Sequence, residues 1–273
     1  MENNIFENYK NKNLFMVSGL DSIGVPYTPD NFLLYSYTDF LIAELKDKNI
    51  NVEYVNLSSL ALSKTYNLIK ILQKDYSNNY YNRLNKRLTE YIINTNQYKR
   101  PINSDFLKKY FKESDYDVKI TTKLKESINP IFILSCGAMD LKNSLEIYTY
   151  KPQKYILKIL FKFLKELDNT MDKIENCLNY ILELNQTTQI YMLGVYPLAK
   201  NKAIETILLP YVILYNKKLN QLCSKYDNVY FVDIIDTKNY MSLNDGHPTL
   251  EGHRFILFKI LETMNQKKLN KRI

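Results

Sequence analysis

The chain has two histidines, His247 and His253, and they lie close together near its C-terminal end. An imidazole can accept and return a proton near neutral pH, because its unperturbed pKa is about 6.5. Asp245 stands just before His247, and a carboxylate there could hold the ring in one tautomer. Near the other end, Leu20-Asp21-Ser22-Ile23-Gly24 offers a serine, whose hydroxyl becomes a nucleophile when an imidazole takes its proton. These residue types predict acyl transfer, with Ser22 as nucleophile, His247 as general base and Asp245 as the acid that orients it.

Each of these residues also has a purely structural interpretation. Ser22 fits an ordinary loop or N-cap serine, and His253 fits a residue that packs or caps in the first turn of the last helix. Asp21 and Asp140 are expected to be hydrogen-bond acceptors that stabilise loops, rather than catalytic groups. The catalytic interpretation therefore depends on a fold that brings the two ends of the chain together.

Five short apolar runs predict buried strands. Helical patterns separate them, and the first helix is expected to run to about residue 47 from Thr28 as N-cap, with Pro29 at its first position. The expected strands are 14–17, 51–56, 131–135, 188–195 and 228–233, and the other expected helices are about 60–72, 151–184, 203–225 and 250–266. This alternation predicts one domain over residues 1–273, a three-layer α/β/α sandwich of the flavodoxin-like kind with a mostly parallel five-stranded sheet.

Residues from about 75 to 125 are rich in lysine and tyrosine and exceed what a simple crossover between strands needs. They are expected to form a helical insertion between the second and third strands. Its tyrosines could cover the apolar face of the insertion, or they could form a binding surface or a lid that shapes specificity.

Polar clusters follow four of the predicted strands, at 21–22, 56–61, 136–140 and 244–247. Ligands of open parallel sheets bind at the carboxyl ends of the strands. We therefore expect these four clusters to meet at one edge of the sheet.

In this order the clusters resemble those of the SGNH (GDSL) hydrolase superfamily of esterases, lipases and acyltransferases. Leu20-Asp21-Ser22-Ile23 stands where the family has Gly-Asp-Ser-Leu, and Gly137-Ala138-Met139-Asp140-Leu141 is similar to its Gly-x-Asn-Asp-Leu. The most specific match is His247-Pro248-Thr249 with Gly252-His253, which is similar to His-Pro-(Ser/Thr)-x-x-Gly-(His/Tyr). The resemblance spans nearly the whole chain. It implies an esterase or acyltransferase that forms an acyl-enzyme from a small-molecule acyl substrate, with or without a bound acyl acceptor, and that needs no metal and no organic cofactor.

The blocks that would bind the oxyanion depart from the family's pattern. The second block has no glycine, so the family's backbone N–H would come from Ala61 or Ser59, together with the N–H of Ser22. In the third block Gly137 is kept, but the family's asparagine is Met139, and a thioether donates no hydrogen bond. Losing one such donor typically costs about 10²–10³ in rate.

The acid of the resemblance is also displaced. The family's position three residues before the histidine is Asn244, while Asp245 is two before it. Either Asp245 orients His247, or the site is a Ser-His dyad oriented by Asn244 or a backbone carbonyl; Asp236 is a more distant candidate. These departures and Met139 support an alternative hypothesis, in which the protein is a non-catalytic binding protein that keeps an SGNH-like pocket.

Charge, cysteine content and apolar runs indicate which partners and which cellular location are expected. The formal charge is +8, but the lysines are spread along the chain among acidic residues, so nucleic-acid binding is not expected. The three cysteines are an odd number without metal-ligand spacing, which predicts free thiols in a reducing compartment. The first residues lack a signal-peptide pattern, and no stretch approaches the roughly 20 apolar residues of a membrane span. These features predict a cytoplasmic protein; they leave the oligomeric state open.

Overall fold

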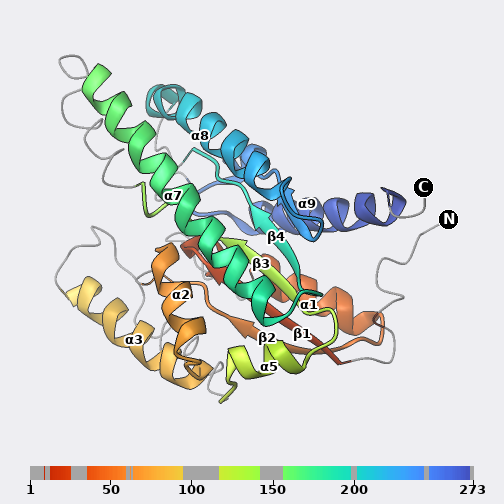
Figure 1. The fold of residues 1–273 in the computed structure, drawn as a ribbon. Coiled ribbons are helices and arrows are strands. Elements are labelled where there is room, and N and C mark those ends of the chain that lie inside the picture. The colour runs from red at the N-terminus through yellow and green to blue at the C-terminus, as the bar shows by residue number, and fades with distance from the viewer. Residues whose placement is uncertain are drawn as a thin grey trace.

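The computed structural model describes residues 9, 13–25, 36–59, 62, 64–94, 117–141, 156–197, 202–242 and 246–270. Its centre is one sheet of five parallel strands in the order β2-β1-β3-β4-β5 (Figure 1). The strands are β1 Asn13–Leu20, β2 Asn51–Asn56, β3 Ile131–Ser135, β4 Gln189–Leu193 and β5 Val229–Val232. The expected α/β fold with a parallel sheet is confirmed.

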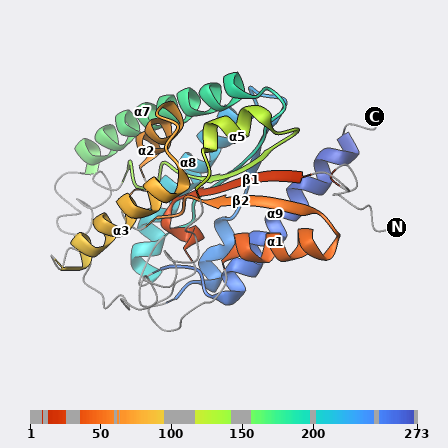
Figure 2. The same ribbon diagram turned by 90° about the horizontal axis from the view of Figure 1, so that it is seen from below.

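Helices cover both faces of the sheet (Figure 2). On β1, Phe15 and Val17 face one hydrophobic cluster, while Leu14 and Met16 face the other. The first cluster includes residues of α2 Thr65–Gln73, α5 Ile120–Glu126, α7 Ile156–Leu184 and α8 Lys202–Cys223, and the second includes residues of α1 Tyr37–Asp47 and α9 Leu250–Asn270. Because both faces of β1, β3 and β4 are buried, these strands are nearly continuous apolar runs, whereas the edge strand β2 is mostly half-buried.

The first helix starts later than its sequence pattern suggested. Ser36 is the N-cap of α1, its hydroxyl accepts from the Thr38 N–H, and Asp39 reaches back to the Ser36 N–H in a capping box. The prediction of one helix from Thr28 to residue 47 is therefore wrong, because the chain is extended at Ser36; Thr28 itself lies outside the described residues. Helix α2 likewise begins at Thr65 rather than near residue 60.

The insertion is helical where it is described, with α3 Asn78–Asn94 followed by the short α5. Its tyrosines differ in burial. Tyr81 is buried in the first core cluster and Tyr76 packs against that cluster, whereas Tyr80 and Tyr91 are exposed. Tyr98, Tyr110 and Tyr116 lie outside the described residues. In the part of the chain that the structure describes, no helix combines the length and apolar character needed to cross a bilayer.

The strand order places a switch point between β1 and β3. The chain winds from β1 to β2 in one direction and then returns to β3 on the other side of β1, so the loops after β1 and β3 diverge and leave room for a ligand. Leu20 pairs with Ser135, and the Asp21 N–H donates to the Ser135 carbonyl at 2.8 Å. The serine block thus begins at this switch point.

Gly19 leaves room for the backbone of the second block, which packs closely against the end of β1. Its φ is +124°, and a Cβ there would lie 2.5 Å from the Ser58 nitrogen and 2.6 Å from the Leu57 carbonyl carbon. We expect Gly19→Ala to lower the free energy of unfolding by about 3 kcal/mol or more, because backbone strain and a clash with backbone atoms add. Urea unfolding would measure this against Gly194→Ala, whose added Cβ meets only side-chain atoms. Equal losses in the two variants would contradict the expectation.

Candidate active site

Ser22 opens a short 3-10 helix, η2 Ser22–Gly24, directly after β1. Asp21 is its N-cap, with extended backbone, and the Asp21 Oδ1 accepts the Ser22 N–H at 2.9 Å. The tight turn fixes the Ser22 backbone at the carboxyl edge of the sheet, and its side chain is half-buried. A serine hydroxyl is thereby held at the switch point.

His247 is held by a loop that closes on itself before α9. The Ser242 N–H donates to the His247 carbonyl at 2.9 Å, and the Thr249 N–H donates to the Tyr240 carbonyl at 2.8 Å. Tyr196, just beyond β4, donates its hydroxyl to the Gly246 carbonyl at 3.3 Å. These bonds fix the backbone on both sides of His247, whose side chain is buried.

The two ends of the chain meet at Ser22 and His247. The Ser22 Oγ lies 3.1 Å from the His247 Nε2, although the two residues are 225 positions apart. This is hydrogen-bond distance for a serine and the base that would take its proton. The pairing that the sequence motifs suggested is therefore present in the geometry.

The acid of a triad is not placed. Asp245 and Asn244 both lie outside the described residues. Asp236, the more distant candidate, is exposed on the 3-10 helix η4 Ile235–Tyr240. Which group orients the His247 ring therefore remains a proposal.

Asp21 is a buried carboxyl beside the nucleophile. Burial raises its pKa to about 6, against the opposing effects of the Ser22 N–H and the nearby His247 ring. It stabilises the turn as expected, because it accepts the Ser22 N–H, the group that the sequence suggested as an oxyanion donor. An oxyanion at this site would have to compete with Asp21 for that N–H.

The second block is buried, and its serine hydroxyl is engaged. The Ser59 Oγ donates to the Asn85 Oδ1 at 2.8 Å and accepts the Leu62 N–H at 2.6 Å. The Ser59 side chain thus holds the loop. Ala61, the position expected to donate an N–H to the oxyanion, lies outside the described residues.

The third block makes a tight turn after β3. Gly137 has φ +93°, and a Cβ there would lie 2.4 Å from the Tyr215 hydroxyl, which donates to the Cys136 carbonyl at 2.6 Å. Only glycine fits this position without displacing Tyr215. Met139 is half-buried in the same turn and offers no N–H or O–H from its side chain.

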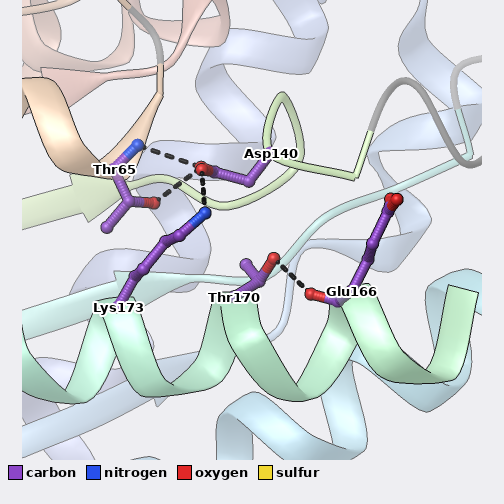
Figure 3. Close-up of polar contacts among 5 residues, drawn as sticks. All are labelled: Thr65, Asp140, Glu166, Thr170 and Lys173. Atoms are coloured by element: carbon purple, nitrogen blue, oxygen red, sulfur yellow. Dashed lines mark hydrogen bonds and ion pairs between the residues drawn. The ribbon is translucent and has the colours of Figure 1, made fainter.

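Asp140 ties the third block to α2 and α7 (Figure 3). Its Oδ2 accepts from the Thr65 N–H and from the Thr65 hydroxyl, both at 2.9 Å, and its Oδ1 lies 3.4 Å from the Lys173 Nζ. The carboxylate therefore caps the N-terminal end of α2, which has no cap from its own N-cap residue. Asp140 is a loop-stabilising acceptor, as expected.

His253 is the structural histidine of the pair. It is fully buried, its ring stacks with that of Tyr37, and its Nδ1 accepts the Tyr37 N–H at the start of α1 at 3.2 Å. Burial, with a smaller contribution from His247, lowers its pKa from 6.5 to about 3. His253 therefore stays neutral at physiological pH and packs and caps, as expected.

This shift predicts a loss of stability on acidification. Below pH 6.5 the unfolded chain protonates His253 while the folded chain does not, so the unfolded state binds more protons until about pH 3. The Asp21 carboxyl, with its pKa raised, acts in the opposite sense between about pH 4 and 6. Asp21 is present in both the wild type and His253→Gln, so its contribution cancels when the stabilities of the two proteins are compared. Between pH 7 and 5 we expect the wild type to lose about 2 kcal/mol more unfolding free energy than the variant; parallel curves in urea titrations would contradict it.

Several positioning side chains were not foreseen from the sequence. Tyr196 and Tyr215 bond loop carbonyls next to the site, and Tyr81 and Asn85 hold the second block from α3. Tyr196 carried a weak signal, since it lies three residues after the end of β4. The others lie inside helices, where no local pattern distinguishes them from residues that only pack.

Comparison with solved structures identifies the fold. A lipase from a goat rumen metagenome matches with a TM-score of 0.60 and 16% identity, over 92% of this chain and 97% of that one. An extracellular lipase from Streptomyces rimosus matches with a TM-score of 0.57 and 10% identity, over 92% and 99%. A GDSL-like lipase from Parabacteroides merdae matches with a TM-score of 0.56 and 15% identity, over 94% and 98%.

The chain therefore has the fold of GDSL-like lipases, the SGNH hydrolase fold, as its motifs suggested. Sequence comparison adds no closer relationship, because neither the models of known protein families nor the curated protein sequences give a match. At such low identities the likeness concerns the fold alone, and the chemistry has to be argued from the side chains of this chain.

Proposed function

We propose that the protein is a serine ester or thioester hydrolase, or a related acyltransferase, of the SGNH type. The observation that carries the proposal is the distance of 3.1 Å between the Ser22 Oγ and the His247 Nε2 at the switch point of the sheet. A nucleophile and its base within hydrogen-bond reach, at the edge where such sheets bind ligands, suit acyl transfer.

In the proposed reaction the Ser22 Oγ attacks the carbonyl carbon of the substrate while the His247 Nε2 takes the hydroxyl proton. The tetrahedral intermediate collapses, the carbon–oxygen or carbon–sulfur bond to the leaving group breaks, and His247 gives the proton to the departing alcohol or thiol. Water or a bound acceptor then attacks the acyl carbon while His247 takes its proton, the bond from that carbon to the Ser22 Oγ breaks, and His247 returns the proton to the Ser22 Oγ. Asp245 orients the ring in this scheme; Asn244 or a backbone carbonyl replaces it in a dyad.

The oxyanion would be bound mainly by backbone N–H groups. We propose the Ala61 N–H as one donor, from the block that Ser59 holds in place, and the Ser22 N–H as a donor shared with Asp21. Gly137 shapes the third side of the site, and Met139 contributes an apolar surface there instead of an amide. This donor set is poorer than the family's, which favours a specialised substrate or transfer to a bound acceptor over a broad lipase.

A cytoplasmic location is part of the proposal. Its support is that Cys136, Cys177 and Cys223 are all buried free thiols, as expected in a reducing compartment. The proposed partners are a small acyl substrate and an acyl acceptor, and we propose no role for nucleic acid.

The second candidate is a binding protein that keeps the pocket without catalysis. Met139 in place of the family's asparagine favours it. Stopped-flow hydrolysis of p-nitrophenyl esters and thioesters of increasing acyl length discriminates between the two. The proposed enzyme gives a burst of about one leaving group per chain followed by slower turnover. Binding of the same esters without any release would support the binding protein.

A further inference from the structure

The loop after β2 is buried although it is neither strand nor helix. Leu57, Ser58 and Ser59 are each at most 1% exposed. The Leu57 N–H donates to the Ser18 carbonyl at 2.6 Å, which extends the pairing with β1 by one residue. Buried backbone outside regular structure needs other hydrogen-bond partners, because an unpaired polar group away from water is costly.

This loop packs against both ends of the serine block. A Cβ on Gly19 would lie 2.5 Å from the Ser58 nitrogen, and a Cβ on Gly24 would lie 2.0 Å from the Ser58 Oγ. Ser58 therefore sits between the end of β1 and the last residue of the turn that begins with Ser22. A shift of the loop would change the surroundings of the nucleophile.

Helix α3, in the insertion, supplies two of the loop's hydrogen bonds. The Tyr81 hydroxyl donates to the Leu57 carbonyl at 2.6 Å. The Asn85 Oδ1 accepts from the Ser59 Oγ at 2.8 Å, and that oxygen in turn accepts the Leu62 N–H at 2.6 Å. In the sequence, Ala61, the proposed oxyanion donor, stands between Ser59 and Leu62. The Ser59 hydroxyl bonded to Asn85 therefore links a residue before Ala61 to a residue after it.

The buried face of α3 is unusually polar. It carries Asn78, Tyr81, Asn82 and Asn85, which are between 1% and 6% exposed. Their spacing of three, four and seven residues places them on one face of the helix. A helix that only covered the sheet would bury aliphatic side chains there. Two residues of this face, Tyr81 and Asn85, instead hydrogen-bond the loop after β2.

We propose that Tyr81 and Asn85 are positioning residues for acyl transfer, which fix loop residues 57–59 beside the serine block. The inference rests on the proposed esterase function and assigns a role to the insertion: α3 holds the second block in place from the carboxyl end of the sheet, where Figures 1 and 2 show it. Both side chains act through the loop and need not touch the substrate.

The test compares Tyr81→Phe, Asn85→Leu and the double variant with the wild type. Each change removes one hydrogen-bonding group and keeps nearly the same volume. Tyr80→Phe is the matched control, because Tyr80 is the neighbouring tyrosine of α3 and is 41% exposed. Asn85→Asp keeps an acceptor oxygen and serves as the rescue variant. For each protein, kcat and KM on a p-nitrophenyl ester and hydrogen exchange of the 57–62 segment are measured well below its melting temperature.

We expect kcat to fall about tenfold in each single variant and about 100-fold in the double variant, since a misplaced donor forfeits part of the 10²–10³ that an oxyanion donor contributes. In these variants KM should stay within about threefold of the wild type, and hydrogen exchange of the 57–62 segment should accelerate at least tenfold. The control Tyr80→Phe should match the wild type. The rescue variant Asn85→Asp should recover most of the kcat lost in Asn85→Leu.

A double variant that is folded and keeps kcat within twofold of the wild type overturns the inference, whatever its exchange rates. A Ser22→Ala arm separates this from failure of the proposed function, which would appear as no turnover by the wild type or as turnover that does not depend on Ser22. In that case hydrogen exchange of the 57–62 segment decides whether α3 positions the loop. An exchange rate in the double variant equal to that of the wild type overturns this positioning.

Discussion

Replacing Ser22 by alanine should lower kcat for ester hydrolysis by about 10⁴-fold or more, to the background rate. The effect is large because the proposed mechanism passes through a covalent acyl-enzyme on the Ser22 Oγ, which lies 3.1 Å from the His247 Nε2. Steady-state kinetics on a p-nitrophenyl ester would measure the loss, and the burst of leaving group should disappear with it.

The fold should survive this substitution. The Ser22 side chain is half-buried, and the turn is fixed by the Ser22 N–H and Asp21, which alanine retains. We therefore expect the melting temperature of Ser22→Ala to stay within a few degrees of the wild type. Ser224→Ala, an exposed serine at the end of α8, is the control and should keep full activity. Residual turnover above one-hundredth of the wild-type rate in Ser22→Ala would contradict the assignment of the nucleophile.

Replacing His247 by alanine should lower kcat by a similar factor, about 10⁴-fold or more. A serine hydroxyl is a weak nucleophile without a base, and His247 is the group that lies within reach of its proton. Because the nucleophile and base act as one unit, the double variant Ser22→Ala/His247→Ala should be hardly slower than either single variant. Steady-state kinetics of the three variants would measure these losses.

The chain offers a matched control for this variant in its other histidine. His253 bonds the start of α1 through its Nδ1, and its lowered pKa keeps it neutral. His253→Gln should therefore reduce stability while keeping kcat within tenfold of the wild type. If His253→Gln abolished turnover in folded protein and His247→Ala did not, the roles assigned to the two histidines would be reversed.

Much of the fold could be predicted because it depends on patterns that are local in sequence. The apolar runs before Ser22 and before Gly137 are buried on both faces of a parallel sheet, and such strands are readable without knowing their neighbours. The pairing of Ser22 with His247 followed from the same logic, since loops after parallel strands share one edge. The order of the motifs then pointed to the fold that the solved structures confirm.

What could not be predicted depends on side-chain geometry and on contacts between distant segments. Thr28-Pro29 looks like a helix start, but Ser36 and Asp39 form the capping box that begins α1, and two competing caps cannot be ranked by pattern alone. The bond between the Ser22 N–H and Asp21 depends on one rotamer. The hydrogen bond between Asn85 and Ser59 joins the insertion to a loop 26 residues earlier, and no hydrophobic periodicity predicts such a contact.

The most direct test of the central claim, that Ser22 and His247 form an assembled nucleophile and base, is intact-mass analysis after exposure to a small serine-reactive organophosphonate. The wild type should gain one adduct per chain, mapped to Ser22, and both Ser22→Ala and His247→Ala should remain unmodified over the same time. A folded wild type that gains no adduct, or one that is labelled equally fast without His247, would contradict the claim.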